Sequence, residues 1–196
     1  MSSSNLVRWS GMATIVGAIL IAILELMEFI LFGSLTESQV AATGGWVFVQ
    51  VIYLIAMLAV LLGLIGLYTR QVEQSGNFGV ISFLVAFIGT VLFAGAQWST
   101  AFIGPMLAAE APGIMDAEPT GSILVGYLLS IILFSLGWLL FGWASLRSSV
   151  FPRGAALLVA VGGVLFFIMG SLEWPASTLA LDAGLVWMGY TLWSAK

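Results

Sequence analysis

Six long apolar runs alternate with short polar connections along this chain of 196 residues. An α-helix needs about 20 mostly apolar residues to cross the hydrocarbon core of a membrane. Helices are the expected form, because lipid offers no partner to an open backbone and a barrel would need short alternating strands. The pattern therefore predicts an all-α membrane protein with six transmembrane helices. The runs are Trp9–Phe32, Gly45–Thr69, Phe78–Phe102, Ser122–Leu146, Gly154–Gly170 and Ala176–Ser194.

The polar connections are sorted by charge. Every second connection, together with both chain ends, carries the basic residues Arg8, Arg70, Arg147, Arg153 and Lys196. The remaining connections contain acids but neither lysine nor arginine. Basic residues collect on the cytoplasmic side of membrane proteins, so this alternation predicts that both termini are cytoplasmic. The short connections make consecutive helices neighbours, which predicts one compact bundle over residues 1–196.

Composition narrows the range of functions. The chain is 61% hydrophobic and only 7% charged, too few charges to cover a water-exposed surface. The absence of any polybasic stretch argues against nucleic acid as a partner. The chain also has no cysteine and no histidine, which removes the usual ligands of zinc and haem and the usual general base. We therefore expect no cofactor and no catalytic residues, and an intramembrane enzyme is the least favoured function.

Two weaker patterns concern helix packing. Arg70 followed by Gln97-Trp98, and Arg147 followed by Glu173-Trp174, suggest a parallel repeat of two hairpins, helices 2–3 and helices 4–5. Glycines recur within the runs, where they let helix backbones approach closely. We expect such contacts at Gly63, Gly66, Gly89, Gly95, Gly137, Gly142, Gly162, Gly163, Gly184 and Gly189. Most tryptophans, including Trp46, fall near the predicted boundaries and form an aromatic belt, whereas Trp138 and Trp187 lie deeper and are expected to pack.

Several segments resemble a group of uncharacterised bacterial six-helix membrane proteins. They are Gly63–Arg70, Gln97-Trp98 with Gly104-Pro105, Gly137–Gly142 and Trp187–Trp193. The resemblance covers most of the chain, but it consists of glycine and aromatic patterns. It implies a bacterial cytoplasmic membrane and carries no activity that can be transferred to particular residues.

Ionisable residues inside the predicted helices are the strongest functional signal, because charge in a membrane is costly. Glu25 and Glu28 are three positions apart and so share a face of the first helix. At a rise of about 1.5 Å per residue, Asp182 lies roughly 21 Å from Lys196, well inside the hydrocarbon. No basic residue lies at these depths. Each acid must be protonated, hydrated, hydrogen-bonded or bound to a cation.

These acids predict a polar pocket that opens to the outside and takes a small cation or an amphipathic cationic ligand. The tryptophans at its mouth would supply cation–π faces. Three simpler interpretations compete with it: acids that merely contact interfacial water, a purely structural hydrogen-bond network, and a non-catalytic accessory or regulatory subunit that docks another membrane protein. The candidate residues are Glu25, Glu28, Gln97, Trp98, Glu173, Trp174 and Asp182.

Overall fold

The computed structural model describes residues 3–170 and 178–195, and within them it contains helices and no strand. Three of the helices are long and apolar enough to cross a membrane: α1, α3 and α6. This architecture is all-α, and its long apolar helices are compatible with an integral membrane protein. The helices are α1 (Ser3–Phe32), α2 (Glu37–Ala41), α3 (Trp46–Phe102), α4 (Gly104–Glu110), α5 (Pro112–Met115), α6 (Gly121–Ser148), α7 (Arg153–Gly170) and α8 (Leu179–Ser194).

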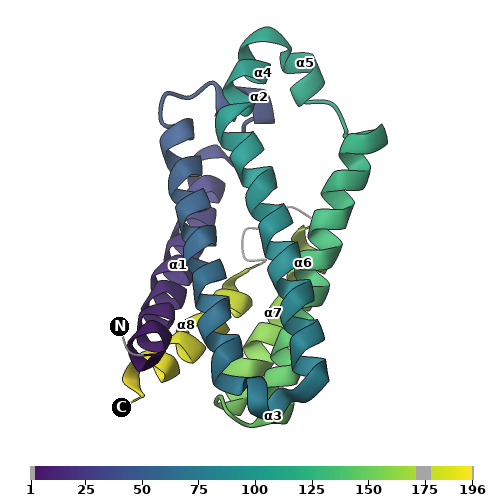
Figure 1. Cartoon of the computed structure of the whole chain (residues 1–196). Coiled ribbons are helices and arrows are strands. Elements are labelled where there is room, and N and C mark those ends of the chain that lie inside the picture. The colour runs from purple at the N-terminus through teal and green to yellow at the C-terminus, as the bar shows by residue number, and fades with distance from the viewer. Residues whose placement is uncertain (1–2, 171–177, 196) are drawn as a thin grey trace.

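The longest helix, α3, is a hairpin. Its 57 residues are interrupted at Gly76, whose backbone (φ 55°, ψ −153°) is not helical. Glycine suits this position because it has no side chain to clash at positive φ. Figure 1 shows the chain descending along the first arm, residues 46–75, and turning back along the second, residues 77–102. The break coincides with the polar connection that separates the second and third predicted runs.

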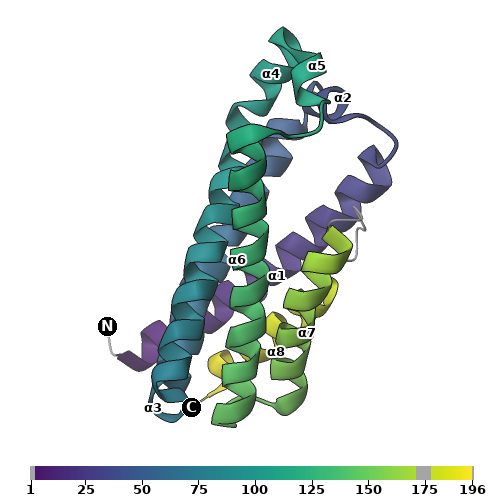
Figure 2. The ribbon, with the colours of Figure 1, turned by 90° about the vertical axis from the view of Figure 1, so that its right-hand side faces the viewer.

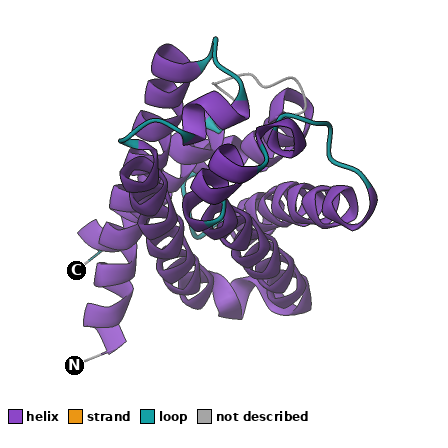
Figure 3. Cartoon of the chain, turned by 90° about the horizontal axis from the view of Figure 1, so that it is seen from above, coloured by secondary structure: helices purple, strands orange, loops and turns teal. Residues whose placement is uncertain are grey.

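The long helices pack as a closed ring. α1 contacts α3 and α8, α3 contacts α6, α6 contacts α7, and α7 contacts α8 (Figures 1 and 2). Seen from above, the helix axes surround a common centre (Figure 3). One core joins them, and its buried members include Leu64, Trp138, Val159 and Leu185. The ring brings the two ends of the chain side by side, because α8 packs against α1.

Glycines sit at several of these contacts. A Cβ at Gly63 would meet Thr14 of α1, one at Gly66 would meet Ser10 of α1, and one at Gly163 would meet Leu139 of α6. The packing prediction is thus confirmed at these positions. It is wrong at Gly95, where no heavy atom lies within 4 Å of the Cβ position, because the second arm of α3 turns this residue away from its neighbours.

The short helices form a cap at one end of the ring. α2, α4 and α5 lie together at the end opposite the two termini and the turn of α3 (Figures 1 and 2). The cap contains Glu37 and Glu110, and Arg8, Arg70 and Arg147 are placed near the other end by their positions in α1, α3 and α6. The arginines therefore lie at the end opposite the cap, where Glu73, beside the turn of α3, is also found.

The burial of the tryptophans differs in part from the predicted pattern of a boundary belt with two packed residues. Trp138 is fully buried, as expected. Trp187 is 46% exposed and lies at the edge of the bundle, where its ring is beside Gly154 of α7. Trp46 is buried beneath the cap in a cluster with Val40 and Phe32, so it does not belong to an exposed belt.

Candidate functional site

Two carboxyl groups from opposite ends of the chain meet at one hydroxyl group. Thr178, which precedes α8, places its Oγ1 2.5 Å from Glu25 Oε2 on α1 and 2.7 Å from Asp182 Oδ2 on α8. Thr178 and Asp182 are one helical turn apart, and the packing of α8 on α1 brings Glu25 to them. Asp182 is 5% exposed and Thr178 is also buried. The structure therefore brings together two of the predicted acids.

The hydrogen atoms of this junction can be counted. The two O···O distances are those of short O–H···O hydrogen bonds to carboxylate. A threonine hydroxyl has a single hydrogen and donates it to only one of the two oxygens. The second bond therefore requires a carboxyl O–H that donates to Thr178 Oγ1. At least one proton is held between Glu25 and Asp182 in this arrangement.

Two further hydrogen bonds join the acids of α1 to the first arm of α3. The Tyr53 hydroxyl donates to Glu25 Oε1 at 3.0 Å, and Gln50 Nε2 donates to Glu28 Oε1 at 2.7 Å. Spacings of three residues explain the register, since Glu25 and Glu28 share a face of α1 while Gln50 and Tyr53 share the facing side of α3. Two parallel carboxyl contacts thus connect α1 to α3.

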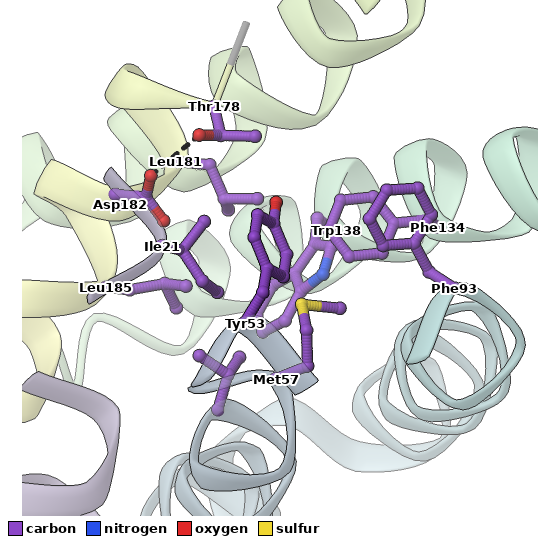
Figure 4. Close-up of a pocket in the computed structure, with 11 residues that line it drawn as sticks. Ile21, Tyr53, Met57, Phe93, Phe134, Trp138, Thr178, Leu181, Asp182 and Leu185 are labelled. Atoms are coloured by element: carbon purple, nitrogen blue, oxygen red, sulfur yellow. Dashed lines mark hydrogen bonds between the residues drawn. The ribbon is translucent and has the colours of Figure 1, made fainter. Parts of the chain in front are cut away.

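A small cavity adjoins the Asp182 side of this network (Figure 4). About 10 Å³ of it is open to the centre of a water-sized sphere, which is room for about one water molecule. Its lining includes Tyr53, Thr178 and Asp182 together with Phe93 and Phe134, from the second arm of α3 and from α6, and the surface that these residues expose to the cavity is apolar. This space at the centre of the ring is too small for an organic ligand.

The other candidate residues have different positions. Glu28 accepts a separate hydrogen bond from Gln50, one turn along α1 from Glu25. Gln97 is half-buried, and Trp98 is 51% exposed and packs on Phe102. Neither of these two lines the cavity beside Asp182. Glu173 and Trp174 lie outside the described residues.

Thr178 is the residue of this candidate site that sequence reasoning missed. A threonine near the end of an apolar run is common, and only its spacing of four residues before Asp182 suggested a shared helix face. Nothing in the sequence indicated that Glu25 would reach the same hydroxyl. Within the described ranges, no group of three or more histidine, cysteine, aspartate or glutamate side chains could hold a metal ion.

The cap contains a second acidic contact. Asp116, in the connection after α5, accepts the Ser38 N–H at 2.8 Å, the Ser38 hydroxyl at 2.7 Å and the Thr36 hydroxyl at 3.2 Å. The Ser38 backbone bond, followed by the Ser38 side-chain bond, lowers the pKa of Asp116 below its ordinary value of 3.8. This carboxylate ties the connection after α5 to the first turn of α2.

An open pocket of about 170 Å³ lies beneath the cap helices, between Glu37 of α2 and Ser99, Thr100 and Leu107 of α3 and α4. Comparison of the chain with protein-family models, with curated proteins and with solved structures finds no match. The interpretation of both sites therefore depends on their geometry and chemistry alone.

Proposed function

We propose that the chain is a multi-pass membrane protein with six spans and both termini in the cytoplasm. The break at Gly76 supports this topology, because each arm of α3 is longer than the about 20 residues that a span requires. α7 and α8, with 18 and 16 residues in their described helices, are near the lower end of that range. The position of the arginines at the end opposite the cap supports the orientation. A bacterial cytoplasmic membrane remains the location that the resemblance implies.

Within this topology, we propose that the acidic network binds a proton and exchanges it for a small cation. The observation that carries the proposal is the hydrogen count at Thr178, where two carboxyl groups share one hydroxyl. Arg8 is the basic residue of α1, and it precedes Glu25 by 17 residues, or roughly 25 Å along the helix. If the shared proton leaves, two negative carboxylates remain side by side. No basic side chain is near enough to neutralise them, so a bound cation must supply the positive charge.

The geometry also supports a route for the proton. A carboxyl proton moves to Thr178 Oγ1 while the original Thr178 hydrogen moves to the other carboxylate, so that one bond to hydrogen forms at Oγ1 as another breaks. The proton thereby passes between Glu25 and Asp182 without a net change of charge at Thr178. Glu28, one turn closer to the cap, is the next acid along α1, and its contact with Gln50 is separate from the contacts of Glu25.

Infrared spectroscopy tests the shared proton directly. A protonated carboxyl group has a C=O stretch distinct from the carboxylate bands, so the purified protein at neutral pH should show it. The band should disappear in the double variant Glu25→Gln, Asp182→Asn and should persist in the control Asp116→Asn. An unchanged spectrum in the double variant would remove the proton from this site.

Proton release tests the exchange. Sodium chloride is added to the protein in weakly buffered detergent solution, and a pH indicator reports released protons. We expect up to one proton per chain from the wild-type protein and none from Asp182→Asn. Release that is equal in Asp182→Asn and in the wild-type protein would place the exchange elsewhere, and no release from either would leave the acids with only a structural role.

One observation favours the second candidate, a non-catalytic accessory subunit. Every residue from Gly121 to Leu129, the first part of α6, is exposed, and no heavy atom lies within 4 Å of the Cβ position of Gly126. A partner helix could cover this segment. A photo-crosslinking residue at Val125 should then give a defined adduct in native membranes, whereas one at the equally apolar Leu157 of α7 should give none.

A further inference from the structure

The open pocket in the cap has walls from four different helices. They are α2, the last turn of α3, α4 and α5, and the pocket has a volume of about 170 Å³. Figures 1 and 2 show these segments gathered at the end of the molecule opposite the two termini. None of its lining residues takes part in the acidic network at Thr178 or in the contact of Glu28 with Gln50. The pocket is therefore a second site, separate from the acids in the interior.

Breaks in the helices form this pocket and fix its shape. Pro105 has no N–H with which to continue the hydrogen bonds of α3, so that helix ends at Phe102 and α4 begins at Gly104. Ala111, the residue before Pro112, leaves the helical conformation and lets α5 turn back. The Asp116 carboxylate then bonds to the first turn of α2. The walls are thus held together without the help of a ligand.

The charge of the cap favours a cationic ligand. The two connections that contain the cap helices, residues 33–45 and 103–120, hold four acids and no lysine, arginine or histidine. A surface with charge of one sign raises the local concentration of ligands of the opposite sign. Glu37 brings this negative charge into the pocket itself, because it is exposed and is one of the lining residues. The acids of the cap are Glu37, Glu110, Asp116 and Glu118.

The polar side chains of the lining suit a ligand that donates hydrogen bonds. The Glu37 carboxylate can only accept them. The Thr100 hydroxyl donates its single hydrogen to the Ala96 carbonyl at 3.1 Å, so its oxygen can only accept from a ligand. The hydroxyl of the exposed Ser99 can accept as well. A primary ammonium group has three N–H donors and no acceptor, which matches this set, whereas a quaternary ammonium group has no N–H to donate.

The apolar part of the lining sets the kind and the size of the cation. Ile103, Leu107 and Met115 contribute it. A bare metal ion needs several oxygen ligands, and among the described residues no three acids come together to hold one. An alkyl chain can instead cover the apolar side chains. A cavity of about 150 Å³ holds a benzene molecule, so the pocket has room for about six non-hydrogen atoms.

We propose that the cap pocket binds a primary alkylammonium ion of about six non-hydrogen atoms, with its charged group on Glu37 and its alkyl chain on Leu107 and Met115. In the proposed topology this ligand comes from the outer side of the membrane. The inference goes beyond proton exchange and does not depend on it, because the pocket shares no residue with the Thr178 network.

Nuclear magnetic resonance of the protein in lipid nanodiscs, labelled with ¹³C at the methionine methyl groups, tests the site. The Met115 and Met57 signals are assigned by their loss in Met115→Leu and Met57→Leu, and n-pentylammonium chloride is the probe. We expect a saturable shift of the Met115 signal, while Met57, beside Asp182 in the interior, stays unmoved. Pentan-1-ol has the same chain without the charge and should bind at least about tenfold more weakly. Equal binding of the alcohol, or a response at Met57 in place of Met115, would overturn the proposal.

Two matched variants identify the carboxylate. Glu37→Gln removes the charge from the pocket and keeps the size of the side chain, so its affinity for pentylammonium should fall at least about tenfold. Glu110→Gln removes a charge of the cap that does not line the pocket, and it should bind nearly as tightly as the wild-type protein. Equal affinity of Glu37→Gln and the wild-type protein would contradict the assignment. If Glu37→Gln does not fold, the comparison with pentan-1-ol in the wild-type protein decides. Asp182→Asn should bind pentylammonium like the wild-type protein, so failure of proton exchange is distinguishable from failure of this proposal.

Discussion

Glu25 and Asp182, on the first and last helices of the chain, are bridged by the single hydroxyl group of Thr178. This contact does two things at once. It ties α8 to α1 where the ring of helices closes, and it holds two acids close enough to share a proton. Both the packing of α8 on α1 and the sharing of the proton therefore depend on the Thr178 side chain. Substitutions at Thr178 measure how much its hydroxyl group contributes.

Replacing Thr178 with valine keeps the volume of the side chain but removes the bridging oxygen. Two buried carboxyl groups then lose a partner, which should lower the free energy of unfolding by about 1–3 kcal/mol. The control Thr178→Ser keeps the hydroxyl and loses one methyl group, a loss of about 0.8 kcal/mol or less. Unfolding in detergent, followed by circular dichroism, measures both. Equal stability of the valine and serine variants would show that the bridge contributes nothing.

Two glycines of α3 provide a matched test of helix packing. A Cβ at Gly66 would collide with Ser10 of α1, so Gly66→Ala should destabilise the protein by about 1–3 kcal/mol. Gly95 faces open space, and Gly95→Ala should raise stability by about 0.5–1 kcal/mol because alanine is the better helix former. Thermal unfolding in one detergent compares the two. The same direction of change in both variants would contradict the contact geometry.

The proposed topology can be tested with single cysteines, because the natural chain has none. Gln74→Cys lies beside the turn of α3, and Gly113→Cys lies in α5 of the cap, and both positions are exposed. In intact cells an impermeant thiol reagent should label Gly113→Cys and spare Gln74→Cys, which should react only after the membrane is opened. Labelling of Gln74→Cys from outside would reverse the orientation or change the number of spans.

The lengths of the apolar runs were sufficient for most of the helix boundaries. The predicted run Ser122–Leu146 corresponds to α6 at Gly121–Ser148, and the connection around Gly76 is where α3 breaks. These features are predictable because a membrane demands long apolar segments and places turns at its surfaces. The helices of the cap were harder to predict from the sequence, because α2, α4 and α5 are too short to form a long apolar run.

The candidate site was predictable only in part. Glu25 and Asp182 stood out because an ionisable residue in an apolar run is rare. Thr178 did not stand out, because its importance comes from a contact between helices that are adjacent in space and distant in sequence. Gly95 shows the same limit for packing: a glycine in an apolar run indicates a close approach only when a neighbouring helix lies on that side.

The cap provides a test that depends on pH. Asp116 binds the first turn of α2 as a carboxylate, and its pKa lies below the ordinary value of 3.8 chiefly because of the Ser38 backbone hydrogen bond. A group whose pKa is lowered on folding contributes stability that is complete above its unfolded pKa and is lost as the pH falls through its folded pKa. Docking of α2 should therefore be constant above about pH 5 and weaken below pH 4.

Hydrogen–deuterium exchange of the segment 36–42, corrected for the intrinsic pH dependence of exchange, measures this docking. Protection should fall in the wild-type protein as the pH drops below 4, because protonated Asp116 no longer accepts three hydrogen bonds. In Asp116→Asn the protection should already be low at neutral pH, since an amide offers only one acceptor oxygen, and it should show no step near pH 4. The control Glu118→Gln should follow the wild-type curve. A step that persists in Asp116→Asn would mean that another group titrates in the cap.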